Sequence, residues 1–142
     1  MHPCYLKKDR LEPEYKFEQY LESLNNIKWW YKNGDRGEKY FSIKYTDISD
    51  RNRMFYPDYL IKLKDGTLCI FDTKGGQTAA SLDTIKKAES LQKFVDKNSC
   101  KDQKLIGGII INDKESWLVN KKANYKYDPD NLSDWTNISN IM

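Results

Sequence analysis

The chain has a single histidine, at position 2 of 142 residues. Serine and cysteine triads, histidine zinc sites and histidine-based phosphodiester chemistry all require an imidazole held inside a folded site. A side chain this close to a terminus is seldom fixed in such a site. We therefore expect any catalysis to rely on carboxylates, lysine, tyrosine or a bound metal.

Cysteine is scarce as well, and long apolar runs are missing. Cys4, Cys69 and Cys100 lie far apart without the spacing of metal ligands, which is typical of a reducing cytoplasm. No apolar run approaches the roughly 20 residues that cross a bilayer, and residues 1–10 contain no apolar segment typical of a secretory signal. These features predict a cytoplasmic protein with no membrane partner.

The net charge is only +3, from 24 basic and 21 acidic residues. Dedicated DNA-binding domains are usually more basic, and here the two signs are mixed along the chain. If the chain binds nucleic acid, we expect that binding to be weak and sensitive to salt. The oligomeric state does not follow from the sequence.

The length and composition predict one globular domain over residues 1–142, since 39% of the residues are hydrophobic and 32% charged. We expect residues 1–12 to be extended or poorly ordered and the core to span about residues 13–119. Residues 120–142 are polar and rich in Asn, Asp and Tyr, so they form a C-terminal extension without assigned structure.

Pro13 and Glu14 mark the start of a helix that is predicted to run to about residue 25. Its apolar residues recur with helical spacing at Phe17, Leu21 and Leu24. Its glutamates follow the same spacing on a neighbouring face, at Glu14, Glu18 and Glu22. Glu14 lies closest to the apolar stripe, so we expect it at a buried edge.

Two β-rich runs, residues 28–31 and 40–45, flank the turn residues 33–37 and predict a first hairpin. The polar residues 46–53 are predicted to form a loop. Trp29 and Trp30 in the first run fit core or interface packing better than base stacking.

A second hairpin is predicted to join residues 55–63 to residues 67–74 through Lys64-Asp65-Gly66. Both arms are apolar on both faces, which is typical of strands in the middle of a sheet. A helix over residues 83–95 and strands over residues 105–112 and 117–119 follow. This order predicts an α/β sandwich with a mixed central sheet flanked by helices. Gly107 and Gly108 leave room for close approach by a helix or a ligand.

The second hairpin carries the residues with chemical potential. Asp72 and Lys74 are two apart on a strand, so their side chains leave the same face. Asp58 stands at the start of the partner arm. A two-residue turn at positions 65–66 would point Asp58 to the opposite face, whereas a three-residue turn at positions 64–66 would bring it opposite Asp72. The sequence suits both turns, and only the second makes a site.

In the second register two carboxylates meet beside an ammonium group. Two buried carboxylates repel each other unless one is protonated or a cation lies between them. Oxygen ligands in this number suit Mg²⁺, which binds one or two carboxylates together with phosphate oxygens. Such a metal stabilises charge on a phosphate and lowers the pKa of a bound water, which Lys74 could orient or help to deprotonate.

Residues 55–58 (Phe-Tyr-Pro-Asp), 65–66 (Asp-Gly) and 71–75 (Phe-Asp-Thr-Lys-Gly) together resemble the PD-(D/E)xK nuclease signature. Over about residues 14–94 the chain more closely resembles the endonuclease domain at the C-terminus of type III restriction enzyme Res subunits and related helicase-nucleases. The stretch Trp29-Trp30-Tyr31-Lys32-Asn33 fits the same family.

This resemblance implies a restriction-endonuclease-like fold and hydrolysis of DNA by an activated water. It implies that Asp58, Asp72 and the Thr73 carbonyl bind Mg²⁺ or Mn²⁺, that Lys74 is the catalytic lysine, and that Glu14 contacts the site through water. It also implies three residues near the DNA backbone: Gln77, Lys86 and Lys87. DNA and a helicase motor domain or subunit are the implied partners.

The chain departs from the family in two ways. Its second acid is Asp72 where the family more often has Glu, and it contains no GxxxxGK[ST] phosphate loop. It is therefore either an isolated domain of a longer chain or a stand-alone relative without the motor.

Simpler interpretations remain for the same residues. Asp58 after a proline could cap a turn, Asp72 and Lys74 could form a surface ion pair, and Glu14 could reflect the preference of a first helical turn for acids. Lys86 and Lys87 could belong to a solvated helix face. The alternative function is a catalytically inactive nuclease-fold module that binds nucleic acid or a protein partner, or a structural domain whose acids hold a partner chain.

Overall fold

The computed structural model of the chain describes residues 12–34 and 40–142. The predicted N-terminal segment, residues 1–12, therefore lies outside the described residues apart from position 12. The described part is built on a six-stranded sheet with the order β1-β4-β5-β6-β7-β8, and β2 and β3 form a separate two-stranded sheet. The strands are β1 (Ile27–Lys32), β2 (Ile43–Thr46), β3 (Asn52–Phe55), β4 (Tyr59–Leu63), β5 (Leu68–Thr73), β6 (Leu105–Asp113), β7 (Ser116–Asn120) and β8 (Trp135–Asn137).

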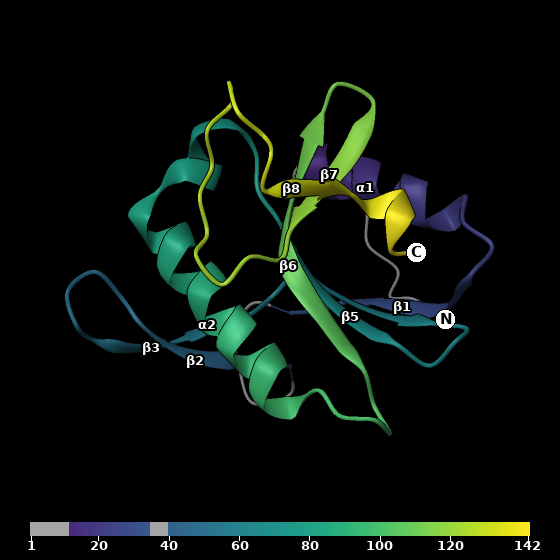
Figure 1. Ribbon diagram of the computed structural model, residues 1–142, viewed down its shortest axis with the longest axis horizontal. Coiled ribbons are helices and arrows are strands. Elements are labelled where there is room, and N and C mark those ends of the chain that lie inside the picture. The colour runs from purple at the N-terminus through teal and green to yellow at the C-terminus, as the bar shows by residue number, and fades with distance from the viewer. Residues whose placement is uncertain (1–11, 35–39) are drawn as a thin grey trace.

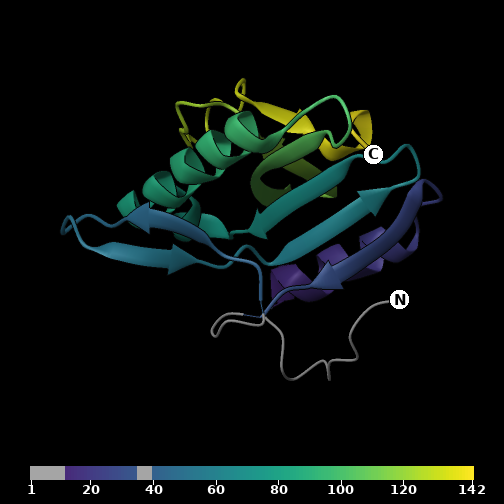
Figure 2. The ribbon, with the colours of Figure 1, turned by 90° about the horizontal axis from the view of Figure 1, so that it is seen from below.

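Two α-helices cover opposite faces of the large sheet (Figures 1 and 2). Helix α1 (Glu12–Glu22) packs Phe17 and Leu21 against Phe71 of β5, whereas α2 (Leu82–Asn98) packs Leu91 against Ile70 of the same strand. Successive residues of β5 thus serve different helices, which explains why both faces of this strand are apolar. Among the described residues, no helix has the length and apolar content to cross a membrane.

The sheet is mixed, as predicted from the order of the elements. Strands β5 and β6 are parallel and are connected by α2, and the other neighbouring pairs in the sheet are antiparallel. A parallel pair requires a crossover connection, and α2 fills that role. The fold is therefore a mixed α/β sandwich, and α2 begins close after the end of β5.

Gly107 allows α2 to approach β6 closely. Of the two neighbours expected at this glycine, a helix or a ligand, it is therefore the helix that is found. A Cβ atom at Gly107 would lie 2.8 Å from Val95 Cγ2. The side chain of Gln92 also donates a hydrogen bond to the Gly107 carbonyl (2.8 Å). A larger residue at position 107 would push the helix away from the sheet.

The predicted first hairpin is wrong in its pairing. Strand β1 pairs with β4, and β2 pairs with β3. The side chain of Asn33 at the end of β1 donates to the carbonyls of Phe41 (2.7 Å) and Pro57 (3.0 Å) and accepts from Phe41 N (3.1 Å). Asn33 thereby connects the end of β1 to the residues that precede β2 and β4. Part of the predicted turn, residues 35–39, lies outside the described residues.

The predicted loop over residues 46–53 forms the turn and part of β3. The carboxylate of Asp47 accepts hydrogen bonds from the backbone of Ser49 (2.8 Å) and Arg51 (3.0 Å), and it pairs with the Arg53 guanidinium (2.5 Å). These bonds fold the polar stretch into a tight turn. The resulting β2–β3 hairpin extends to one side of the molecule (Figure 1).

The core extends beyond the predicted boundary at residue 119. Trp135 begins β8 at the edge of the sheet, and Ile138 is fully buried in the cluster under α1. Tyr125 is buried as well, and its hydroxyl donates to the Ala79 carbonyl (2.6 Å). Ala79 belongs to a short 3₁₀ helix, η2 (Gly76–Ala80), which connects β5 to α2.

Candidate active site

The β4–β5 hairpin has the three-residue turn. Leu63 N donates to the Thr67 carbonyl (2.8 Å), and Gly66 adopts a left-handed φ of 97°. Glycine reaches this conformation without steric cost, which explains its place at the end of the turn. Counting back from this pair along the two strands brings Asp58 opposite Asp72. The two acids are therefore neighbours across the hairpin.

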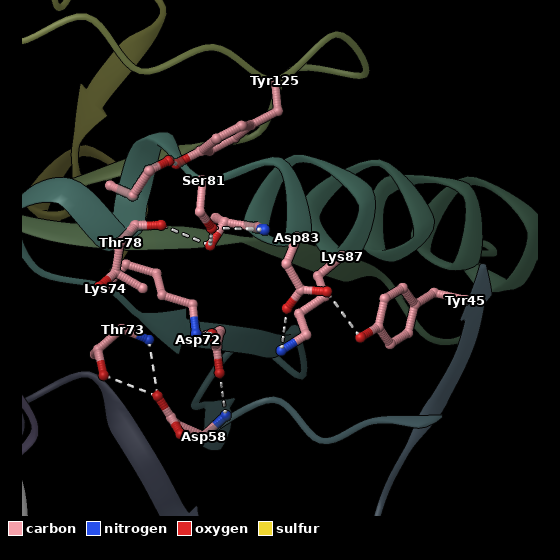
Figure 3. A network of polar contacts seen from close by, with 12 residues as sticks. Tyr45, Asp58, Asp72, Thr73, Lys74, Thr78, Ser81, Asp83, Lys87 and Tyr125 are labelled. Atoms are coloured by element: carbon pink, nitrogen blue, oxygen red, sulfur yellow. Dashed lines mark hydrogen bonds and ion pairs between the residues drawn. The ribbon is translucent and has the colours of Figure 1, made fainter. Parts of the chain in front are cut away.

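One oxygen of each acid is fixed by the hairpin itself (Figure 3). Asp72 Oδ1 accepts from the backbone N–H of Asp58 (3.0 Å). Asp58 Oδ2 accepts from both the backbone N–H (3.0 Å) and the hydroxyl (2.8 Å) of Thr73. The two carboxylates are thus oriented by bonds to each other's strand, which limits their rotation.

The second oxygen of each acid faces an ammonium group. Asp72 Oδ2 lies 2.9 Å from Lys74 Nζ, and Asp58 Oδ1 lies 3.7 Å from Lys32 Nζ. Asp72 Oδ2 is buried and accepts no hydrogen bond of good geometry, so its contact with Lys74 has the distance of an ion pair without the direction of a hydrogen bond. A buried carboxylate oxygen in this state is able to accept a stronger ligand.

Burial sets the proton affinity of Asp72. Burial first, and then the neighbouring carboxylate of Asp58, raise the pKa of Asp72 to about 7, although the Lys74 ammonium opposes this. For Lys74, burial by itself would lower the pKa, but the charges of Asp72 and Asp58 raise it overall. Lys74 therefore carries its proton at neutral pH and acts in this state as a cation, not as a base.

Helix α1 contributes a second acid to the same end of the sheet. Lys32 Nζ lies 3.0 Å from Glu14 Oε2 and thus bridges Glu14 and Asp58. Burial, followed by the charge of Asp58, raises the pKa of Glu14. Burial would lower the pKa of Lys32, but Asp58 and Glu14 raise it overall. The three predicted acids and two lysines therefore form one charge network.

Glu18 is more buried than Glu14, contrary to the expectation that Glu14 would be the buried glutamate of the helix. Glu18 is 5% exposed, and its Oε2 accepts from the hydroxyl of Tyr59 (2.7 Å). The same hydroxyl lies 3.1 Å from the Glu14 carbonyl. A glutamate can be buried when the interior offers it a hydrogen-bond donor, and helical spacing alone does not show where such a donor lies.

Two charged residues that the sequence did not single out join this region. Lys32 is one. The alternation of side chains along β1 could have indicated its burial, because it places Lys32 on the same face as the buried Trp30. Asp83 in the first turn of α2 is the other. Its Oδ1 accepts from the Tyr45 hydroxyl (3.0 Å), and its Oδ2 pairs with Lys87 (3.0 Å; Figure 3). The charge of Asp83 also helps to raise the pKa of Lys74, after the larger effects of Asp72 and Asp58.

The three residues expected near DNA have different surroundings. Lys87 is held by Asp83, and its ammonium lies 5.8 Å and 5.5 Å from the ring centres of Tyr45 and Phe55. Lys86, on α2, and Gln77, on η2, are exposed. Lys87 thus has a fixed position beside the charge network. Contact of these three residues with DNA stays a prediction.

The donor set fits a hard divalent cation. The backbone of the hairpin holds Asp58 Oδ2 and Asp72 Oδ1, which leaves Asp58 Oδ1 and Asp72 Oδ2 for a ligand. Carboxylate oxygens are preferred ligands of Mg²⁺. Within residues 12–34 and 40–142, no group of three or more His, Cys, Asp or Glu side chains is arranged to hold a metal. The predicted set needs only two side chains, because its third ligand is the main-chain carbonyl of Thr73.

Comparisons with known proteins identify a family. The model described as YagJ family matches residues 7–124, which is most of the chain and includes both hairpins and the charge network. No curated protein and no solved structure matches the chain. The chain belongs to the YagJ family.

Proposed function

We propose that the chain is a metal-dependent endonuclease with a restriction-endonuclease-like fold, which hydrolyses DNA phosphodiester bonds with an activated water. The observation that carries this proposal is the three-residue turn of the β4–β5 hairpin, because it sets Asp58 opposite Asp72 with Lys74 paired to Asp72. The two-residue turn would have separated the acids. DNA, as the substrate, and a motor domain or subunit, as a partner that directs cutting, belong to the same proposal.

The residues of the chain have distinct roles in this proposal. Asp58 and Asp72, with the carbonyl of Thr73, would hold Mg²⁺ or Mn²⁺, which supplies charge stabilisation and an acidified water. The backbone bonds to Asp58 Oδ2 and Asp72 Oδ1 keep the two acids oriented before any ligand arrives. Lys74 offsets charge on the phosphate and orients the attacking water through its ammonium. Glu14 contacts the site through water.

Burial supports the site against the simpler interpretation of a surface ion pair. The side chains of Asp72 and Lys74 are 3% and 18% exposed, so this pair is not a solvated contact of little energetic weight. Capping of Thr73 accounts for Asp58 Oδ2. The other oxygen, Oδ1, faces only the more distant ammonium of Lys32 (3.7 Å), and it is the oxygen that a metal would use.

A second candidate function has its own supporting observation. Each of the three acids already contacts the ammonium of Lys32 or Lys74, so none lacks a positive partner without a metal. This pairing favours an inactive nuclease-fold module that binds nucleic acid or a protein partner. The two candidates differ in whether a divalent cation can displace the ammonium groups.

Calorimetry with Mn²⁺ tests the proposal, with plasmid nicking measured on the same samples. We expect the wild type to bind Mn²⁺ and to nick, and Asp72→Ala to do neither. Asp96→Ala is the matched control, because Asp96 is an exposed acid near the far end of α2, and it should behave like the wild type. Mn²⁺ binding without nicking would indicate a missing partner or substrate. If the wild type binds no Mn²⁺ even with DNA present, the inactive module is the better description.

A further inference from the structure

Strand β1 separates two kinds of aromatic residue. Trp30 is buried against the ring of Tyr59 (6.1 Å between centres), whereas Trp29 and Tyr31 are each 37% exposed. Because side chains alternate along a strand, Trp29 and Tyr31 leave the face opposite to Trp30. Core packing is therefore confirmed for Trp30, whereas the ring of Trp29 is partly exposed and available to a partner.

The two exposed rings border a hollow of about 480 Å³, which Lys28 and Leu60 complete. Residues i and i+2 of a strand lie about 6.7 Å apart. This is twice the separation of roughly 3.4 Å between stacked bases. The spacing of the two residues along β1 therefore matches the room that one planar ring needs for a stacking contact on each side. A double-stranded stack has no unpaired base to insert.

A β-bulge adds a positive charge to this hollow. The register between β1 and β4 shifts between Ile27 and Trp29, so Lys28 is the additional residue of β1. Lys28 is exposed and lines the hollow beside Trp29. An ammonium next to a stacking site suits the phosphate that accompanies a base.

The hollow lies on the same face of the sheet as the acid pair. Tyr31 is directly opposite Leu60, and Leu60 packs with Ile70 in the cluster under α2. Asp72 is two residues beyond Ile70 on β5, and therefore shares that face. Asp58 is two residues before Leu60 along the chain, so its Cα lies roughly 8 Å from that of Tyr31 by strand geometry. That spacing is comparable to the distance between neighbouring phosphates of an extended strand.

Charge decides between nucleic acid and a second copy of the chain. A second hollow, between β2 and α2, is lined by Lys44, Lys93 and Lys97 and by no acid. Its Phe94 and the Leu60 of the first hollow pack against the same cluster under α2. Two copies meeting through these hollows would bring their lysines together, whereas a polyanion would neutralise them.

We infer that this face binds single-stranded nucleic acid, with one unpaired base stacked between Trp29 and Tyr31 and the adjoining phosphate beside Lys28. The purpose of this contact rests on the proposed function: it would bring a neighbouring phosphate to Asp58 and Asp72. The binding itself requires no metal.

Fluorescence anisotropy in EDTA tests the binding with a labelled 12-nucleotide oligo-dT and a labelled 12-base-pair duplex at low salt. We expect Trp29→Ala and Tyr31→Ala each to weaken oligo-dT binding about tenfold or more, because base stacking on an aromatic ring has an effect of that size. Trp29→Phe should retain most of the affinity. Ile48→Ala is the control, since Ile48 is an exposed apolar residue in the turn of the β2–β3 hairpin.

Three results would overturn the inference: no binding of oligo-dT by the wild type, unchanged binding by Trp29→Ala, or an equal loss for the duplex. Light scattering on the same proteins adds one more. If Trp29→Ala converts a wild-type dimer to a monomer and leaves oligo-dT binding unchanged, the face joins two copies of the chain. Failure of the proposed nuclease is distinguishable, because it would abolish nicking in Mn²⁺ and leave binding in EDTA intact.

Discussion

The β2–β3 and β4–β5 hairpins each hold a buried aspartate, and the two aspartates have opposite hydrogen-bonding environments. In the β2–β3 hairpin both oxygens of Asp47 have hydrogen-bond donors. In the β4–β5 hairpin only one oxygen of Asp72 has a donor, and the other faces an ammonium at a poor angle. A carboxylate with all its bonds made within the chain stabilises a turn. One with a buried oxygen left over has capacity to bind something else.

The proton affinities of the two acids diverge accordingly. Hydrogen bonds from the Arg51 backbone and the Arg53 side chain lower the pKa of Asp47 to about 2. Burial and the charge of Asp58 raise the pKa of Asp72 to about 7. Folding thus stabilises the charged form of Asp47 relative to the unfolded chain. For Asp72, folding destabilises the charged form.

The strongest way to sharpen this comparison is to remove the charge of each acid and follow Mn²⁺. Asp72→Asn keeps the shape of the side chain but removes its charge, and we expect Mn²⁺ affinity and nicking to fall by roughly a hundredfold or more. Asp47→Asn should leave both unchanged. Calorimetry and plasmid nicking at pH 8 measure the effect, and equal losses in the two variants would remove the distinction between the hairpins.

The next largest effect is expected on stability, with the opposite sign from a usual core mutation. A raised pKa means that Asp72 stabilises the fold below its unfolded pKa near 4, and that this contribution is lost as the pH rises through about 7. Asp72→Asn should therefore increase the free energy of unfolding at pH 8, by an amount on the order of 4 kcal/mol, because each unit of a raised pKa corresponds to about 1.4 kcal/mol.

Urea unfolding at pH 5 and pH 8 measures this change. The gain from Asp72→Asn should shrink at pH 5, where the wild-type carboxyl is already protonated. A variant that is less stable than the wild type at pH 8 would show that the ion pair with Lys74 outweighs the cost of burying the charge.

Asp47 should respond in the other direction. Its lowered pKa gives a contribution that is present above the unfolded pKa near 4 and is lost as the pH falls through the folded value near 2. Asp47→Asn should lower the urea midpoint at pH 7, and the difference from the wild type should fade toward pH 2. An unchanged midpoint at pH 7 would mean that the turn holds without its charged acceptor.

The smallest effect is expected at Lys32, which links Glu14 to Asp58. Lys32→Gln removes the ammonium that lies 3.7 Å from Asp58 Oδ1, so less positive charge competes with a divalent cation. We expect Mn²⁺ affinity to rise a few-fold, which calorimetry can resolve. Lys62→Gln is the matched control on β4, because Lys62 contacts Gln103 at the other end of the hairpin. A fall in affinity would instead make Lys32 part of the binding site.

The sequence predicted the helices and the strands of the core well, because their apolar residues recur with clear periods. It failed at the first hairpin, where the partner of β1 is β4 and the choice depends on contacts between distant segments such as Trp30 and Tyr59. Local turn residues carry no information about such a partner. The register of the second hairpin was open for a related reason, since Asp65-Gly66 suits two turns and the pairing of Leu63 with Thr67 decides between them.

For the site, the spacing of Asp58, Asp72 and Lys74 predicts that the two acids of the hairpin meet beside the lysine, once the register of the strands is known. Lys32 was missed because a lysine on a strand normally lies in solvent, and its burial depends on acids from α1 and the β4–β5 hairpin. Glu14 was expected to be more buried than Glu18, and the hydroxyl of Tyr59, 41 residues further along the chain, reversed that order. The roles of these residues in catalysis stay predictions.

The hydrogen bond from Tyr125 to Ala79 connects two parts of the chain that are 46 residues apart. It fixes η2, the segment that carries the chain from Lys74 into α2 (Figure 3). The match to the family model ends at residue 124, one residue before this tyrosine. A protein trimmed to that match would keep every acid and lysine of the network and lose the tyrosine that braces η2 behind them.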